Sequence, residues 1–221
     1  MPQQLTFDWP TGVALGAEDF FVSDANAQAY AMLQNPDSWP EHKLALIGPG
    51  ASGKSHLARV VQGPLQAQIC TPATLPDIRQ IGRALIVEDM HLITPDAYEP
   101  MFHIHNHLRH AGGTLLMTAR TAPSRWPIAL PDLASRMQAA SLAIIDAPDD
   151  ALLSALMMKL FADRQIMPQP TLISYLLPRI ERSYDAAASI VARLDAQSLA
   201  QGRPVSRALA ATLLDNDAQD G

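Results

Sequence analysis

The segment Gly48–Ser55, GPGASGKS, has the residue types and spacing of a loop that binds phosphate groups. Gly50 and Gly53 would allow positive φ angles, which bring backbone N–H groups close to phosphate oxygens. Lys54 would reach the β- and γ-phosphates of a nucleotide, and the hydroxyl of Ser55 would bind Mg²⁺. An apolar run precedes the loop and a helical pattern follows it, which is the setting that this chemistry requires. The sequence therefore predicts a nucleotide site, and a chance glycine-rich turn is the alternative.

Two acidic residues follow the next apolar run of the chain, residues 84–87. Ligands of open α/β sheets gather at the carboxyl ends of the strands, so Glu88 and Asp89 are expected close to the phosphates. Glu88 would hold the hydration shell of Mg²⁺, and Asp89 would orient a water molecule. Acidic residues also follow strands as helix caps, which is the alternative interpretation. The phosphate loop upstream favours the nucleotide site.

A third strand is predicted over residues 112–120, and it ends in Thr118 to Arg120, where a sensor of the γ-phosphate would lie. The helical stretch before it carries His103 and His107 at positions i and i+4. No Cys or acidic ligand motif accompanies these histidines, so we interpret them as packing or surface residues of a helix that ends at Gly112.

Arg136 lies ahead of the last predicted strand, residues 141–146. A guanidinium in this place has three candidate roles: a surface charge, one half of an ion pair, or a catalytic finger that enters the nucleotide site of a neighbouring molecule. Spacing alone favours the surface charge.

The chain is long and apolar enough to form a sizeable core, since 48% of its 221 residues are hydrophobic. Strand, loop and helix signals alternate up to residue 146, which predicts an α/β fold with a parallel sheet. Pro and Gly then divide a series of helical stretches that contain no further strand, which predicts a small helical bundle. We expect an extended tail over residues 1–12, an α/β nucleotide-binding domain over 13–147 and a helical domain over 148–221.

Net charge and cysteine content limit the expected environment and partners. The formal charge of −6 argues against direct adhesion to nucleic acid, because phosphate binding needs clustered Lys and Arg. Cys70 is the only cysteine, so no internal disulfide can form and a reducing compartment is expected. The sequence has no apolar run of the roughly 18–20 residues that cross a bilayer, and it lacks a signal peptide. We expect a cytoplasmic protein that avoids membranes and meets DNA only indirectly.

These motifs together resemble AAA+ ATPases, and more closely the initiator branch that contains DnaA and the Hda family of regulatory inactivators of DnaA. The similar segments are EDFFVSDANAQAY (18–30), GPGASGKSHLA (48–58), LIVEDMHLI (85–93), FHIHNHLRHAGGTLLMTARTAPSRWP (102–127) and LASRM (133–137). The resemblance covers most of the chain. It implies a three-layer αβα module with a parallel sheet, followed by a small helical lid.

The resemblance also implies roles for single residues. Asn26 matches an Asn near the adenine pocket of the family, and Arg136 matches the finger arginine that acts in trans. Arg182 is the best candidate for the second sensor arginine, and other registers place Tyr184 or Asp185 there. ADP or ATP, with Mg²⁺, would be bound by the loop residues Gly48, Pro49, Gly50, Ala51, Ser52, Gly53, Lys54, Ser55 and His56.

Departures from the initiator pattern favour the Hda outline. Only 32 residues separate Ser55 from Glu88, too few for the helical insertion with which initiators grip single strands. The chain ends about where the lid ends, so no helix-turn-helix domain that reads DNA boxes is expected. Glu88 replaces the more usual Asp, and the second sensor is uncertain, so weak or absent self-hydrolysis is expected. Diphosphate binding remains expected, because backbone amides and Lys54 cradle the phosphates.

The first ten residues, MPQQLTFDWP, carry large apolar side chains and little charge. Gln4, Leu5 and Phe7 resemble the glutamine-led peptide with which Hda-type proteins dock on the sliding clamp, the beta subunit of DNA polymerase. The alternative is that Phe7 and Trp9 fold back on the protein's own surface.

The resemblance as a whole implies a negative regulator of replication initiation, either a monomer or a homodimer. Bound to a nucleotide and docked on the DNA-loaded clamp, it would insert Arg136 into the ATP site of DnaA and stimulate hydrolysis there. Two other classes share the phosphate loop, namely a helicase loader of the DnaC type and a small-molecule kinase. Residues 147–221 lack the arginine-rich lid of such a kinase.

Overall fold

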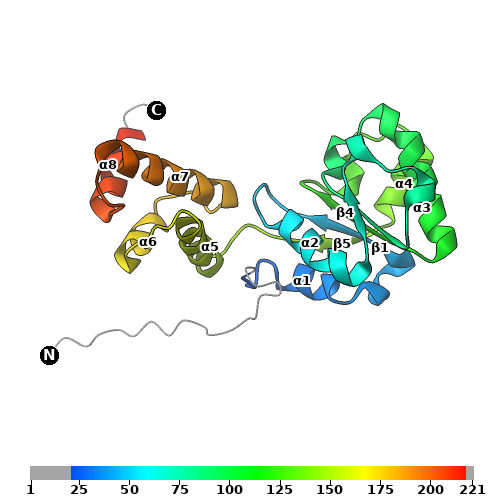
Figure 1. Ribbon diagram of the computed structural model, residues 1–221, viewed down its shortest axis with the longest axis horizontal. Coiled ribbons are helices and arrows are strands. Elements are labelled where there is room, and N and C mark those ends of the chain that lie inside the picture. The colour runs from blue at the N-terminus through cyan, green and yellow to red at the C-terminus, as the bar shows by residue number, and fades with distance from the viewer. Residues whose placement is uncertain (1–20, 218–221) are drawn as a thin grey trace.

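The computed structural model describes residues 21–217, which form a sheet flanked by helices and a group of helices beyond it (Figure 1). The strands are β1 Lys43–Ile47, β2 Gln68–Cys70, β3 Ala84–Val87, β4 Thr114–Ala119 and β5 Ser141–Ile144. The helices that surround the sheet are α1 Ala27–Leu33, α2 Lys54–Leu65, α3 Tyr98–Ala111 and α4 Pro131–Gln138. The helices that follow are α5 Asp150–Ala162, α6 Pro170–Leu176, α7 Tyr184–Gln201 and α8 Arg207–Asp217.

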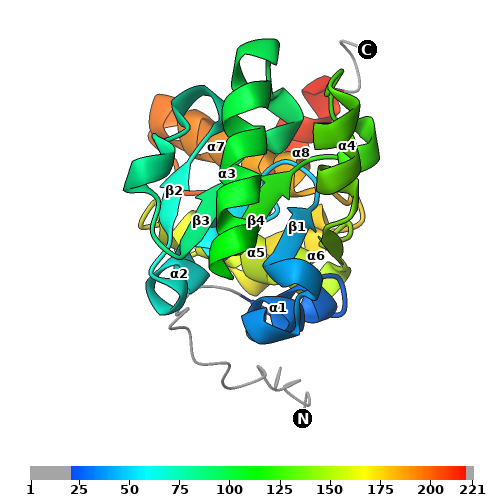
Figure 2. The same cartoon turned by 90° about the vertical axis from the view of Figure 1, so that its right-hand side faces the viewer.

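The five strands are parallel and lie in the order β2-β3-β4-β1-β5. Figure 2 shows α3 lying across one face of this sheet, with β2, β3, β4 and β1 side by side behind it. The adjacent strands β1 and β4 continue into helices that pack on opposite faces, α2 after β1 and α4 after β4. Such a switch point opens a crevice at the carboxyl ends of the two strands, where ligands of α/β sheets bind.

Alternate residues of the strands pack into two separate cores, one on each face of the sheet. In β1, Ala45 and Ile47 pack with α3 and α4, whereas Leu44 and Leu46 pack with α1 and α2. Successive side chains of a strand point to opposite faces, so an apolar run of this kind is stable only when both faces are covered. This burial makes the sheet the middle of three layers.

The helices after the sheet have a third core of their own, built around Met157, Phe161 and Leu194, all fully buried. Tyr184, the first residue of α7, is buried instead in the core that contains α1 and α2. Its hydroxyl donates a hydrogen bond to the carbonyl oxygen of Asp146, 3.4 Å away. The beginning of α7 is therefore attached to the α/β part of the protein.

The α/β architecture with a parallel sheet and a following helical part is confirmed, and the four strands predicted from the sequence are present. One strand was missed, β2, which has only three residues. Its first residue is exposed and only its last, Cys70, is buried, so its short segment has no apolar periodicity that could distinguish it from a loop.

Candidate nucleotide-binding site

The phosphate loop connects the carboxyl end of β1 to α2, as predicted. The N–H of Gly48 donates to the carbonyl oxygen of Ala119, the last residue of β4, at 3.2 Å. The loop therefore begins in the crevice where β1 and β4 end. Helix α2 follows Gly53 directly, and its unpaired N–H groups and positive dipole end favour an anion.

The unusual backbone angles of the loop only partly match the prediction. Gly53 has a positive φ of 86°, as expected, but the expectation for Gly50 was wrong. Ala51 takes the left-handed conformation instead, with φ 55°. Gly50 instead lies against α7, since a Cβ added there would lie 2.7 Å from Oδ2 of Asp185.

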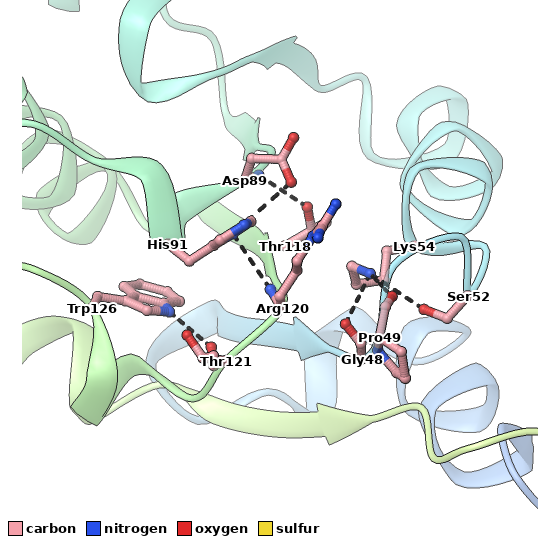
Figure 3. A network of polar contacts seen from close by, with 10 residues as sticks. All are labelled: Gly48, Pro49, Ser52, Lys54, Asp89, His91, Thr118, Arg120, Thr121 and Trp126. Atoms are coloured by element: carbon pink, nitrogen blue, oxygen red, sulfur yellow. Dashed lines mark hydrogen bonds and ion pairs between the residues drawn. The ribbon is translucent and has the colours of Figure 1, made fainter. Parts of the chain in front are cut away.

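Lys54 is buried, and its ammonium group is folded onto the loop (Figure 3). Nζ donates hydrogen bonds to the carbonyl oxygens of Gly48, at 2.9 Å, and Pro49. A further contact joins Nζ to Oγ of Ser52 at 3.3 Å. Bound phosphates would offer this cation stronger, charged acceptors in place of neutral carbonyl groups.

Charges of both signs surround the mouth of the loop. Burial lowers the pKa of Lys54 and the charge of Arg120 lowers it further, whereas Asp89 and Asp185 act to raise it. Figure 3 shows the side chain of Arg120 between Asp89 and the phosphate loop. Two cations thus converge where the sequence predicts phosphate groups, and two carboxylates flank them.

The ends of β3 and β4 are joined by polar contacts that position Asp89. Its N–H donates to Oγ1 of the buried Thr118 at 3.2 Å, and its own φ is 56°. The N–H of Arg120 donates to Nδ1 of His91 at 3.4 Å. Burial lowers the pKa of His91, which favours the neutral ring that this hydrogen bond requires. The sequence motifs alone indicate no role for His91.

The residues predicted to hold Mg²⁺ fit that role. Ser55 lies in the first turn of α2 and is exposed. Glu88 follows β3, and its Oε1 is buried without a hydrogen-bond partner among the described residues. A buried carboxylate oxygen without a partner is costly, and a hydrated Mg²⁺ ion would satisfy it. Ser55 would bind the ion directly and Glu88 would bind it through water.

Asn26 is buried at the start of α1, with both ends of its amide group in use. Nδ2 donates to the carbonyl oxygen of Phe21 at 2.9 Å, and Oδ1 accepts from the N–H of Ser23 at 2.9 Å. The residue therefore holds the segment 21–26 in shape. The predicted position of Asn26 near the adenine pocket stays a prediction.

The predicted second sensor, Arg182, is exposed and turned to another partner. Its Nη2 lies 3.1 Å from both carboxylate oxygens of Asp150 in α5. Asp185, the second residue of α7, lies against the phosphate loop, and it is one of the alternatives that the sequence offers for this register. The α7 side chain next to the loop is therefore a carboxylate and not a guanidinium.

Arg136 lies in the last turn of α4 and is half-buried. Its Nη1 donates to Oδ1 of Asn106 at 2.9 Å, and its guanidinium carbon lies 4.7 Å from the ring centre of Phe102. Both partners belong to α3. These contacts fix the orientation of the guanidinium, and the hydrogen bond to Asn106 uses one of its five N–H donors.

A buried cation supports the end of α4. Nζ of Lys43 donates to the carbonyl oxygen of Arg136 at 3.3 Å and lies 2.9 Å from Oε2 of Glu41. It also lies 3.2 Å from Nε2 of His105. An ammonium group has no acceptor, so Nε2 must be the unprotonated nitrogen of this ring. Neither Lys43 nor His105 was predicted to have a role. The only signal in the sequence is that Lys43 is a charged residue at the start of an apolar strand.

The predicted clamp-binding residues Gln4, Leu5 and Phe7 lie outside the described residues, so their role stays a prediction. His56 lies in the first turn of α2, next to Ser55. Within residues 21–217, no helix is long and apolar enough to cross a membrane.

The sheet, the phosphate loop and the following helices define the class of the fold, which is an α/β module with a five-stranded parallel sheet, a phosphate loop after β1 and a following helical part. No protein-family model and no curated protein sequence matches the chain. Solved structures do match it. The three described below share less than 20% of their sequence with this chain, so the likeness concerns the fold.

Within this class, domain III of the replication initiation protein DnaA from Thermotoga maritima matches with a TM-score of 0.73 and 19% identity, over 90% of this chain and 95% of that domain. DnaA from Aquifex aeolicus, solved with AMPPCP, matches with a TM-score of 0.64 and 14% identity, over 79% of this chain and 63% of that one. RuvB from Thermotoga maritima, a Holliday junction branch migration motor, matches with a TM-score of 0.61 and 14% identity, over 86% of this chain and 65% of that one.

Proposed function

We propose that this protein is a nucleotide-bound regulator of the Hda type, which stimulates hydrolysis of ATP on DnaA by donating Arg136 in trans. Through Gln4, Leu5 and Phe7 it would dock on the DNA-loaded sliding clamp, so its contact with DNA is indirect. ADP is the proposed resident nucleotide, with Mg²⁺ held by Ser55 and Glu88. The outcome is negative regulation of replication initiation.

The position of Arg136 relative to the protein's own phosphate loop carries this proposal. Its carbonyl oxygen is bonded to Lys43, the first residue of β1, whereas the loop follows Ile47 at the other end of that strand. Four residue steps of a parallel strand span about 13 Å. The side chain also points to α3 and not towards the loop. Arg136 is therefore suited to the nucleotide of another molecule.

The orientation of the Arg136 guanidinium supports a catalytic role in trans. Asn106 and Phe102 hold the side chain in place, which reduces the entropy lost when it enters a partner's site. There the guanidinium would neutralise charge that develops on the transferring phosphoryl group. Trans-acting arginines of this kind accelerate hydrolysis by about 10³- to 10⁵-fold.

The structure of the protein's own site supports binding more than turnover. Lys54 and the N–H groups of the loop offer cationic and dipolar partners to phosphates. Arg182, just ahead of α7, is paired with Asp150, and the α7 side chain that lies against the loop is the carboxylate of Asp185 rather than a cation. Hydrolysis needs every charge in place, whereas diphosphate binding does not.

A reconstituted hydrolysis assay tests the proposed function. ATP-loaded DnaA is incubated with this protein, ADP and DNA-loaded clamp, and each component is omitted in turn. We expect rapid conversion to ADP–DnaA only in the complete mixture, and Lys54→Ala should lose both ADP binding and stimulation. Unchanged DnaA hydrolysis in the complete mixture would refute the proposal. Phosphoryl transfer to metabolites by the isolated protein would favour a kinase instead, and loading of a helicase would favour a loader.

A further inference from the structure

Asp185 is the lid residue that faces the phosphate loop. A Cβ added to Gly50 would lie 2.7 Å from Oδ2 and 3.2 Å from Oδ1 of Asp185, so the whole carboxylate rests against this glycine. Gly50 directly follows Gly48 and Pro49, whose carbonyl oxygens accept hydrogen bonds from Lys54. The carboxylate therefore lies beside the ammonium group that would bind the terminal phosphates.

Neighbouring residues hold Asp185 at this place. Tyr184 is buried in the core of the α/β part, with its hydroxyl on the carbonyl oxygen of Asp146. Ser183 caps α7, because its Oγ accepts from the N–H of Ala186 at 3.0 Å. The first turn of an α-helix stabilises a carboxylate through the positive end of the helix dipole. The backbone of Asp185 is thus held next to the phosphate loop by residues on both sides of it.

A negative charge at this point affects nucleotides according to their own charge. A nucleoside triphosphate carries one more phosphate, and about one more negative charge, than the diphosphate. The extra group must lie beyond the β-phosphate, next to Lys54 and Gly50. Asp185 would repel it there, whereas an arginine in the same position would attract it.

We propose that Asp185 is a specificity-determining residue, which makes the site prefer a nucleoside diphosphate to a triphosphate by charge repulsion of the terminal phosphate. This inference rests on the proposed nucleotide site and deepens it. It gives a physical reason for a regulator that stays in the diphosphate state without having to hydrolyse a triphosphate first.

The test compares dissociation constants for ADP and for the non-hydrolysable triphosphate AMPPCP, both with Mg²⁺, by calorimetry on the full chain. The variants are Asp185→Asn and, as a matched control, Asp163→Asn, which removes the same charge from an exposed position at the end of α5. Asp185→Asn should lower the ratio of the AMPPCP constant to the ADP constant by about fivefold, an effect that shrinks at high salt because Asp185 is exposed. Asp163→Asn should leave the ratio unchanged.

Each alternative result is decisive. An unchanged ratio in Asp185→Asn would overturn this inference. Weaker AMPPCP binding would also overturn it, because that result is expected for a lost Mg²⁺ ligand. Neither result would contradict the proposed nucleotide site. If neither the parent nor Asp185→Asn binds either nucleotide, the inference and the nucleotide site of the proposed function fail together. If only Asp185→Asn binds AMPPCP, the repulsion is stronger than expected and the inference is supported. Melting temperatures establish that all variants are folded.

Discussion

His105 is uncharged in the folded protein at neutral pH, because burial, reinforced by the charge of Lys43, lowers its pKa to about 4. Nε2 accepts a hydrogen bond from the Lys43 ammonium, and Nδ1 is buried without a partner among the described residues. Protonation at Nε2 would bring two cations together beneath Arg136. The ring therefore serves as a neutral acceptor that holds Lys43 under the end of α4.

The depressed pKa of His105 predicts acid sensitivity. In the unfolded chain its pKa is near the ordinary value of 6.5, so the unfolded state binds the proton more readily. The contribution to stability is complete above pH 6.5 and is lost as the pH falls through 6.5 towards 4, by on the order of 3 kcal/mol in total. Urea unfolding of the parent and of His105→Gln between pH 7.5 and 4.5 measures this loss of stability.

Gln can accept from Lys43 but does not titrate, so His105→Gln should show a smaller loss of stability over this pH range. Parallel curves for the two proteins would contradict the assigned pKa. The pair of Lys43 and His105 was not predicted, because the histidines of α3 were judged by their spacing along one helix. The contact joins residues 62 positions apart in the chain, and only the packing of α3 against β1 reveals it.

At the scale of elements, the glycines of the phosphate loop differ in what surrounds them. A Cβ at Gly48 would lie 2.9 Å from Cβ of Ile145 and 3.0 Å from its carbonyl oxygen, and the backbone there cannot move independently of the sheet. The three atoms nearest to a Cβ at Gly50 would all belong to the carboxylate of Asp185, the end of an exposed side chain that can rotate away. Gly50 also lacks the positive φ that disfavours alanine.

This difference predicts an order of stability for two variants of the same loop. Gly48→Ala should lower the free energy of unfolding by about 2 kcal/mol or more, since core strain is among the most costly effects of a substitution. Gly50→Ala should cost less than about 1 kcal/mol. Thermal unfolding without nucleotide compares them, and a larger loss in Gly50→Ala would mean that α7 cannot yield at Asp185.

The elements around the loop were predictable because their signals are local. The strand, the loop and α2 lie within residues 43–65, and Gly112 ends α3 with a φ of 62°, as its sequence position indicated. The contact of Asp185 with Gly50 was not predictable, since it depends on how the lid packs against a loop 135 residues earlier in the chain. The sequence offered only competing registers for that position.

At the scale of the whole molecule, the tail and the nucleotide site have separate roles in the proposed function. Replacing Gln4, Leu5 and Phe7 together by Ala should abolish binding to the DNA-loaded clamp, because the amide and both apolar anchors of an extended peptide are lost. Binding of ADP should not change. Surface plasmon resonance on immobilised clamp measures the first effect, and calorimetry measures the second.

Stimulation of DnaA by the tail variant should fall when the components are dilute and recover at high protein concentration, because a tether acts by raising effective concentration. If the variant binds the clamp with the affinity of the parent, these three residues do not dock the protein on the clamp. Loss of ADP binding in the same variant would show that the tail supports the fold instead.

The central claim is that Arg136 acts on the nucleotide of another molecule, and hydrolysis of DnaA-bound ATP by matched variants tests it most directly. Arg109 provides the control. It is exposed in the last turn of α3, and its charge acts on Glu41, whose partner Lys43 is bonded to the carbonyl oxygen of Arg136. We predict that Arg136→Ala and Arg136→Lys bind ADP and clamp as the parent does but lose stimulation, because a lysine lacks the planar fork of a guanidinium. Arg109→Ala should retain stimulation. Full stimulation of DnaA by Arg136→Ala would contradict the account.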